Sequence, residues 1–438
     1  MYIFETIFLV KEFHLPISIE LSFSYEQVQK ILLDNFNTSL DFCKRLSPYY
    51  KDHLQGVAPL NDLADCRLLP FTEKDAFAQN QDAFLCVAEE EVVDISTTSG
   101  STGAPLLVKL TPKDLERLAY NEFLSFSRAG LTSQDRVLLA VTQDKCFIAG
   151  LACFSGLQRV GATAIRVGPT SPEMLLSLGR KVNATAIVGV PSYLLRVSDY
   201  AKAIQFPLKN QCIEKLLLIG EPIRNQNFSL NSLGARLKEA WGCCLYSTYG
   251  STELQTSFCE CAQGQGGHLH PELVHVEIID DDGLPVMPGE IGEVVVTTFG
   301  VEAMPLIRYK TGDISFLATN ACGCGLKTPR LGPIIGRKKQ KLKIKGTTLY
   351  PQAIINVLDE MLDLEDYVIV ITSTGDMVDH VEIRLCFRSS HDLTDLLKER
   401  LKGQLKISPD LMLSSTAEIM QIKSSVSERK KTKIVDRR

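Results

Sequence analysis

The sequence predicts an α/β protein with two domains: a large amino-terminal domain of mostly parallel sheets with a β-rich subdomain, and a small α+β domain after it. Three observations predict this. The 438 residues are too many for one compact core. Short apolar runs alternate with helical stretches from about residue 135 to 222. The pattern then changes near residue 272 and again near 335, so we expect domains at 1–335 and 336–438.

The elements of the large domain follow from periodicity. Apolar residues at helical spacing in 24–46 predict that the first hundred residues are mainly helical. Gly or Pro follows most of the apolar runs at 135–142, 162–168, 184–191 and 214–222, and helical stretches at 171–182 and 191–204 lie between them. Strands alternating with helices predict a mostly parallel sheet, whose ligands gather beyond the carboxyl ends of the strands. After residue 272, alternating apolar and polar residues around glycine-rich turns predict antiparallel strands.

The last hundred residues predict the small domain. We expect a helix at about 351–362, a strand pair at about 367–387, a helix at about 391–405 and a basic tail. Residues 335–438 hold 19 Lys and Arg against 15 Asp and Glu, so this part carries +4 while the rest carries −9. An acidic body with a basic lid suits an anionic ligand held between them.

Composition excludes several classes. A net charge of −5 argues against a general nucleic-acid binder. The sequence has no stretch of about 18 uncharged apolar residues, so we expect no transmembrane helix. The first 14 residues lack the basic start and cleavage site of a signal peptide. Thirteen scattered cysteines, an odd number, fit a reducing compartment, so we expect a cytoplasmic protein.

The stretch "STTSGSTGAP" (96–105) joins two strand-like runs, 90–96 and 106–111. It is no Walker A motif, because no lysine follows its second glycine. Its glycines let backbone N–H groups turn towards an anion, and its hydroxyls add donors. The loop itself leaves two interpretations open, a hydroxyl-rich hairpin turn or a phosphate-binding loop.

Four further stretches follow this loop along the chain in the order that one superfamily shows. They are "YSTYGSTELQ" (246–255), "RYKTGDIS" (308–315), "GRKKQKLKIKG" (336–346) and "SERKKTKIVDRR" (427–438). Together the five resemble the adenylate-forming superfamily of acyl-CoA synthetases, adenylation domains and luciferases. The resemblance covers nearly the whole chain. It is closest to the phenylacetate-CoA ligase family, because the stretch "LPFTEKDAF" (69–77) resembles the entry segment of that family.

The resemblance implies a nucleotide site. The loop would hold the β- and γ-phosphates of ATP, Thr252 would contact the α-phosphate, and Glu253 would bind Mg²⁺, a hard cation that prefers carboxylate oxygens. Asp313 would accept hydrogen bonds from both ribose hydroxyls, and Arg337 would reach the ribose or phosphates. The loop residues are Thr98, Ser99, Gly100, Ser101, Thr102 and Gly103. Tyr249 would pack against adenine, and Gly250 and Ser251 would also belong to the nucleotide site. Each has a structural alternative, such as a core tyrosine or a turn aspartate.

The resemblance also implies a moving domain. Lys339 stands where the family places its hinge, near 337–340, at which the small domain would swing between two half-reactions. Lys430 is the expected adenylation lysine, with Lys431 as competitor. The family's ending carries Gly and Arg where this chain has Arg429 and Lys433. A basic tail without a catalytic role is the alternative.

A Cys/His set lies in "CECAQGQGGHLH" (259–270) and "CGCG" (322–325). Three thiolates and one imidazole suit a structural, tetrahedral Zn²⁺. By resemblance the ligands would be Cys261, His268, Cys322 and Cys324, with Cys259 and His270 as substitutes. Reduced cysteines in turns are the alternative.

The acyl pocket is the least specified site. The resemblance places it near the strand ends before residue 249, with candidates Phe147, Tyr193, Gly220, Glu221 and Tyr246. The implied activity is an ATP-dependent acid–thiol ligase that uses ATP, Mg²⁺ and coenzyme A on an aryl carboxylic acid and releases AMP and pyrophosphate. An adenylyltransferase, a carrier-protein-loading enzyme and an inactive nucleotide-binding scaffold are the alternatives. Dimers are common among relatives, and the sequence carries no signal for the oligomeric state.

Overall fold

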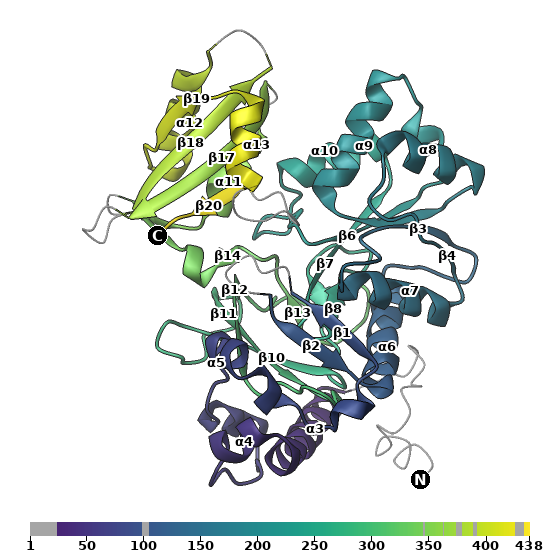
Figure 1. Ribbon diagram of the computed structural model, residues 1–438, viewed down its shortest axis with the longest axis vertical. Coiled ribbons are helices and arrows are strands. Elements are labelled where there is room, and N and C mark those ends of the chain that lie inside the picture. The colour runs from purple at the N-terminus through teal and green to yellow at the C-terminus, as the bar shows by residue number, and fades with distance from the viewer. Residues whose placement is uncertain are drawn as a thin grey trace. The chain divides into compact units, whose positions relative to one another are not determined.

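The computed structural model describes residues 24–98, 105–344, 347–361, 363–373, 379–388, 392–424 and 433–438. They form two compact units (Figure 1). The first ends at Ile334, apart from Gly312–Ile314, which group with the second; the second otherwise consists mainly of Ile335–Arg438. Among the described residues, no helix is both long and apolar enough to cross a membrane.

The first unit begins with the predicted helical region. A reciprocal hydrogen-bonded cap at Ser24 and Gln27 starts helix α3. Its apolar face, including Phe36 and Leu40, joins a core shared with the antiparallel strands of this unit. The helical elements here are α3 (Tyr25–Leu46), α4 (Pro48–His53), α5 (Lys74–Gln79) and the 3₁₀ turns η1 (Leu63–Leu68), η2 (Gln81–Phe84) and η3 (Glu89–Glu91).

Two strands flank the loop at 96–105, as predicted. Strand β1 (Asp94–Thr97) pairs antiparallel with β2 (Leu107–Leu110). Thr111 then caps helix α6 (Pro112–Arg128), with Pro112 in the first turn, where its missing N–H costs no hydrogen bond.

A mostly parallel sheet follows and confirms the predicted α/β class. Its strand order is β4-β3-β5-β6-β7-β8, and only β8 runs antiparallel to its neighbour. Helices α8, α9 and α10 cover one face, and α6 and α7 cover the other (Figure 1). The elements are β3 (Arg136–Ala140), α7 (Ile148–Val160), β4 (Thr163–Ile165), α8 (Pro172–Lys181), β5 (Ala186–Gly189), α9 (Pro191–Ala203), η4 (Leu208–Asn210), β6 (Lys215–Ile219), α10 (Ser232–Trp241), β7 (Cys244–Ser251) and β8 (Thr256–Cys259).

The predicted antiparallel strands follow residue 272. Strand β10 (Val274–Ile279) pairs with β11 (Gly292–Thr298), which neighbours β12 (Tyr309–Ser315). A two-stranded ladder of β9 (Gly267–His268) and β13 (Arg330–Leu331) brings two distant loops together. This small ladder fixes one of the candidate sites described below.

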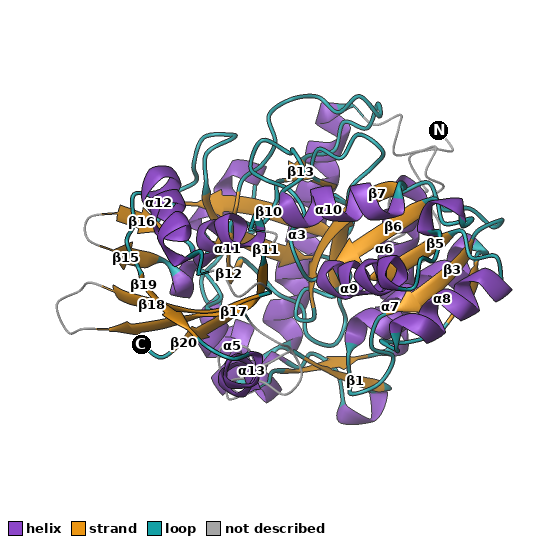
Figure 2. Cartoon of the chain, turned by 90° about the horizontal axis from the view of Figure 1, so that it is seen from above, coloured by secondary structure: helices purple, strands orange, loops and turns teal. Residues whose placement is uncertain are grey.

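The second unit is built on a four-stranded sheet, β19-β18-β17-β20, with α11 and α12 on one face and α13 on the other (Figure 2). Its elements are β14 (Gly336–Arg337), η5 (Lys338–Gln340), β15 (Leu342–Ile344), β16 (Thr347–Leu349), α11 (Pro351–Asp359), β17 (Leu364–Ser373), β18 (Asp379–Phe387), α12 (Thr394–Leu405), β19 (Asp410–Leu413), α13 (Thr416–Ser424) and β20 (Ile434–Asp436).

Two predictions for this unit need correction. The basic stretch 336–346 is strand-like in sequence, but within it a 3₁₀ turn, η5, separates β14 from β15. The region after 405 was expected to be only a tail, but it holds α13 and two parallel edge strands. Ser415 and Glu418 cap α13 reciprocally, which is a readable helix-start signal.

Candidate functional site

The turn after β7 carries the residues predicted to meet the nucleotide. Tyr249 and Gly250 lie opposite Phe258 and Ser257 of β8, so the strand pair ends in a tight turn that holds Thr252 and Glu253. A Cβ on Gly250 would approach the Thr256 carbonyl oxygen to 3.0 Å, so the close strand approach favours glycine. The parallel strands of the sheet point their carboxyl ends towards this turn, where α/β folds bind ligands.

Glu253 is a buried carboxylate with a positive partner. Its side chain is 6% exposed, and its Oε1 accepts a hydrogen bond from Lys74 Nζ at 2.9 Å and one from the Tyr309 hydroxyl at 3.4 Å. Burial acts to raise the pKa of Glu253, but the Lys74 ion pair and local hydrogen bonds outweigh burial and lower the pKa below its ordinary value. The carboxylate is therefore ionised at neutral pH and can serve a hard cation.

Lys74 is a site residue to which the sequence assigned no role. It is the first residue of α5, and the segment before it is fixed to β12 by backbone hydrogen bonds from Thr72 to Arg308 and from Lys310 to Thr72. The segment "LPFTEKDAF" contributed to the resemblance, but nothing in the sequence indicates that Lys74 meets Glu253, 179 positions away.

Of the predicted phosphate loop, only Thr98 lies in the described part of the chain; Ser99, Gly100, Ser101, Thr102 and Gly103 lie outside it. The Thr98 hydroxyl accepts a hydrogen bond from the Leu106 amide at 2.9 Å, and the Thr98 amide donates to the Leu106 carbonyl at 3.0 Å. Thr98 therefore closes the base of the loop.

Asp313 and Arg337 lie directly opposite each other where β12 pairs with β14. Arg337 Nε lies 3.4 Å from Asp313 Oδ1, and Arg337 is about two-fifths exposed. Gly312, before Asp313, has a φ of +76°, a backbone conformation that glycine tolerates best. The predicted ribose and phosphate contacts thus belong to one strand pair.

The predicted hinge lysine lies among the described residues, whereas the predicted adenylation lysines do not. Lys339 lies in the 3₁₀ turn η5, directly after β14. Lys430 and Lys431 lie outside the described residues. Lys433, which stands in place of the family's arginine, pairs with Asp359 at 2.8 Å and lies 5.0 Å from the centre of the Tyr367 ring.

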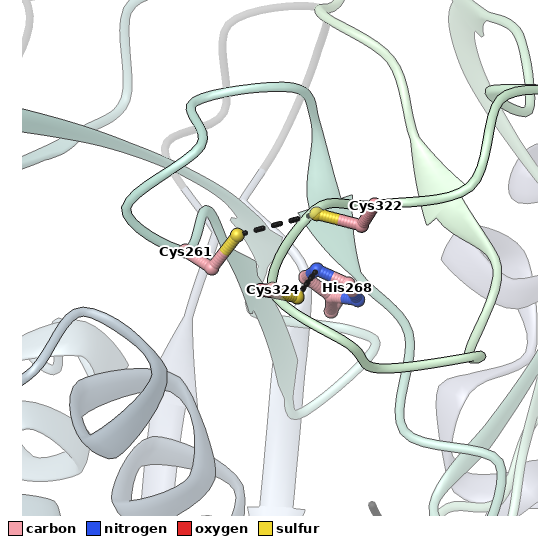
Figure 3. Close-up of side chains that lie close together, drawn as sticks. All are labelled: Cys261, His268, Cys322 and Cys324. Atoms are coloured by element: carbon pink, nitrogen blue, oxygen red, sulfur yellow. Dashed lines mark hydrogen bonds between the residues drawn. The ribbon is translucent and has the colours of Figure 1, made fainter.

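The structure brings together the four predicted zinc ligands, Cys261, His268, Cys322 and Cys324 (Figure 3). Their ligand atoms all lie within 4.8 Å of one another. Cys261 Sγ is 3.5 Å from Cys322 Sγ, and Cys324 Sγ is 3.4 Å from His268 Nε2. Tetrahedral zinc with Zn–S bonds of about 2.3 Å needs ligand separations close to these, so the donor set fits the metal.

The surroundings of this cluster prepare it for a metal. His268 Nδ1 lies 3.0 Å from the Thr328 hydroxyl, an outer contact of the kind that leaves Nε2 to face a metal. Burial, with Arg128 and Arg330 nearby, lowers the pKa of His268 to about 3, so the imidazole is neutral. The substitutes lie elsewhere: Cys259 packs among apolar side chains, and His270 contacts Arg128 at 2.7 Å.

A second group, Cys66, His275 and Glu277, also lies within 4.8 Å. Both oxygens of Glu277, however, accept hydrogen bonds from the buried Arg308, at 2.9 and 3.0 Å. The guanidinium already neutralises the carboxylate, so this group is an internal ion pair with neighbours.

The candidate acyl residues come from several elements of the parallel sheet and its helices. Tyr193 packs with the α8–α10 side of the sheet and Tyr246 with the α6–α7 side. Gly220 follows β6 with a φ of +81°, and the Glu221 carboxylate accepts hydrogen bonds from the Ser192 amide at 2.8 Å and hydroxyl at 2.9 Å. Glu221 thus caps the amino end of α9. Phe147 precedes α7.

Comparisons with known proteins bear on this arrangement. The model of the AMP-binding enzyme family matches residues 49–303, more than half of the chain. The chain is 28% identical over 348 residues to the phenylacetate-coenzyme A ligase of Thermus thermophilus, covering 77% of this chain and 76% of the relative. It is 25% identical over 419 residues to the phenylacetate-coenzyme A ligase of Escherichia coli, covering 90% and 93%.

Solved structures show the same fold. A 2-hydroxyisobutyryl-CoA ligase in the postadenylation state, in complex with R3-HIB-AMP, superposes with a TM-score of 0.84 at 19% identity and covers 97% of this chain and 94% of the other. ATP-bound MatB from Rhodopseudomonas palustris gives 0.59 at 18% identity, with 75% and 65% covered. The chain therefore belongs to the AMP-binding enzyme family, within the adenylate-forming superfamily that includes the acyl-CoA ligases.

Proposed function

We propose that this protein is an ATP-dependent acid–thiol ligase that activates an aryl carboxylic acid as its acyl-adenylate and transfers the acyl group to coenzyme A. The observation that carries the proposal is the buried, ionised Glu253 at the carboxyl end of the parallel sheet, held by Lys74, in a chain of this family. Aryl acids are proposed because phenylacetate-coenzyme A ligases align with most of the chain.

In the first half-reaction, a carboxylate oxygen attacks the α-phosphorus of ATP, and the bond to pyrophosphate breaks. The chain's task is to position the reactants and to balance charge. Glu253 would bind Mg²⁺, which neutralises phosphate charge when bound. Lys74 already holds the charge of Glu253 and would keep that carboxylate ionised before the nucleotide enters. Thr252 and the loop at 98–103 would donate to the phosphates.

The nucleoside would be held by Tyr249, Asp313 and Arg337. The two oxygens of Asp313 match the two adjacent ribose hydroxyls, and Arg337 Nε lies 3.4 Å from Asp313 Oδ1. The adenylation lysine would be Lys430. Lys431 is the competitor, whereas the ammonium of Lys433 pairs with both oxygens of Asp359.

In the second half-reaction, the thiol of coenzyme A attacks the acyl carbonyl and AMP leaves. We propose that the small domain, residues 336–438, turns at Lys339 between the two steps, so that one site serves both. The cluster of Cys261, His268, Cys322 and Cys324 would bind one structural zinc ion, which pins the loop after β8 to the loop before β13.

The testing experiment is pyrophosphate release with ATP and Mg²⁺ across aryl and aliphatic acids, with and without coenzyme A. Release that needs a particular aryl acid, with AMP formed only when coenzyme A is added, is the expected result. Release without coenzyme A-dependent AMP would indicate an adenylyltransferase or a carrier-protein-loading enzyme. ATP binding without release for any acid would contradict the proposal and favour the scaffold alternative.

A further inference from the structure

The side chain of Arg438 lies against the backbone of the hinge turn. Its Nη2 donates a hydrogen bond to the Lys339 carbonyl oxygen at 2.9 Å, and its Nη1 donates to the Lys341 carbonyl oxygen at 3.0 Å. The two carbonyls lie on either side of Gln340, so one guanidinium spans the end of η5. The contact joins residues 97 and 99 positions apart in the chain.

The guanidinium is itself firmly held. Nε and Nη2 donate to the two oxygens of Asp436 at 3.0 and 2.6 Å, and Nη1 donates to Asp379 Oδ1 at 3.0 Å. With the two carbonyls, these bonds engage all five N–H donors of an arginine. The Arg438 side chain is only 20% exposed.

Both carboxylates belong to the body of the second unit. Asp436 lies in β20, which pairs parallel with β17. In that pairing Asp436 lies opposite Ile371. Asp379 begins β18, and its Oδ2 also accepts a hydrogen bond from the Lys343 amide of β15 at 2.6 Å. Arg438 therefore connects the central sheet of the unit to the turn that contains Lys339.

We propose that Arg438 is a positioning residue that latches the hinge turn to the sheet of the second unit and so biases the hinge between its two orientations. This inference rests on the proposed function, which supplies the two half-reactions. A backbone rotation at Lys339 turns its carbonyl relative to that of Lys341, and a rigid, planar guanidinium cannot follow both. At least one hydrogen bond differs between the two orientations, and a difference of that kind shifts a two-state equilibrium.

The test compares Arg438→Gln and Arg438→Lys with Arg437→Gln, in the full chain. Arg437 is the matched control because it is the exposed neighbour and holds the sheet through its backbone amide, which donates to Ile371. The first readout is amide hydrogen exchange of residues 338–344, which needs no activity. The second is the ratio of the rate of pyrophosphate release to the rate of AMP release from supplied acyl-adenylate and coenzyme A.

We expect Arg438→Gln to speed exchange in 338–344 and to change the ratio, each by roughly fivefold, the effect of losing about one net hydrogen bond. The exchange rate and the ratio of Arg438→Lys should lie between those of wild type and Arg438→Gln, because an ammonium keeps the charge but lacks the planar set of N–H donors of a guanidinium. Arg437→Gln should match wild type. Unchanged exchange would overturn the latch, and faster exchange with an unchanged ratio in an active enzyme would overturn its positioning role. A wild type silent in both half-reactions would instead remove the proposed function and the hinge role together.

Discussion

A buried carboxyl in α6 gives the sharpest stability prediction. Glu122 is 6% exposed, and the Ser257 hydroxyl donates to its Oε1 at 2.6 Å. Burial raises the pKa of Glu122 from 4.5 to about 7, although the Ser257 hydrogen bond acts to lower it. Because the folded pKa lies above the unfolded value, the neutral carboxyl stabilises the fold fully below pH 4.5, and this contribution is lost as the pH rises through about 7.

The perturbation is Glu122→Gln, which keeps the shape and removes the titration. For one group with these two pKa values, the free energy of unfolding of wild type should fall relative to the variant by about 2.5 kcal/mol between pH 5 and pH 8. Replacing the carboxyl by an amide can also change the free energy of unfolding, but that change is the same at every pH because the amide does not titrate. The neighbouring thiols of Cys153 and Cys259 do not interfere, because burial raises the pKa of each well above this range.

The assay is urea unfolding at pH 5, 6, 7 and 8, followed by fluorescence. The chain has one tryptophan, Trp241, which is buried in the first unit, so the signal reports on the unit that contains Glu122. Ser257→Ala serves as a second variant: it removes a bond that lowers the pKa, so the loss of stability should extend to higher pH. Parallel stability curves for wild type and Glu122→Gln between pH 5 and pH 8 would contradict the raised pKa of Glu122.

Four further variants concern the candidate sites and the sheet edge of the second unit. Cys322→Ser should reduce bound zinc in dialysed protein from about one ion per chain to a trace by mass spectrometry, and zinc-free, fully stable wild type would exclude the site. Lys74→Ala should lower the free energy of unfolding by about 1–2 kcal/mol, since it leaves Glu253 buried without its ion pair, and an unchanged urea midpoint would contradict this. Lys430→Ala should abolish pyrophosphate release but spare thioester formation from supplied acyl-adenylate, and equal loss of both half-reactions would contradict its role as the adenylation lysine. Lys433→Ala should instead lower the melting temperature, because it removes the ion pair with Asp359.

The elements with strong periodicity were predictable. The four apolar runs between 135 and 222 each became a strand of the parallel sheet, because a strand covered on both faces needs apolar side chains on both. The short edge strands β19 and β20 were not predicted. They pair only on one side, and in β19 most side chains are exposed, so they carry little apolar signal.

The candidate sites show the same limit at the level of single residues. Choosing Cys261 over Cys259 needed the resemblance, although the pairing of Cys259 with Thr248 now shows why Cys259 faces the core. The pairing of Lys74 with Glu253 was not predictable, because tertiary folding alone brings these distant positions together. Tyr193 and Tyr246 are both predicted to line the acyl pocket, and only the sheet reveals that they pack against its opposite faces.

The structure of the second unit bears on how strongly the departures from the family's ending at positions 429 and 433 support an inactive scaffold. Lys433 stands where the family pattern has an arginine, close to the altered "SERKK" ending (427–431) that best supports an inactive scaffold. Its ammonium binds both oxygens of Asp359, and its carbonyl accepts a hydrogen bond from the Ile369 amide at 2.9 Å, so position 433 is a well-partnered part of the sheet edge. A lysine there is accommodated structurally and says nothing against catalysis. The scaffold alternative then depends on Arg429, and an Arg429→Gly variant that gains pyrophosphate release over a silent wild type would be its strongest support.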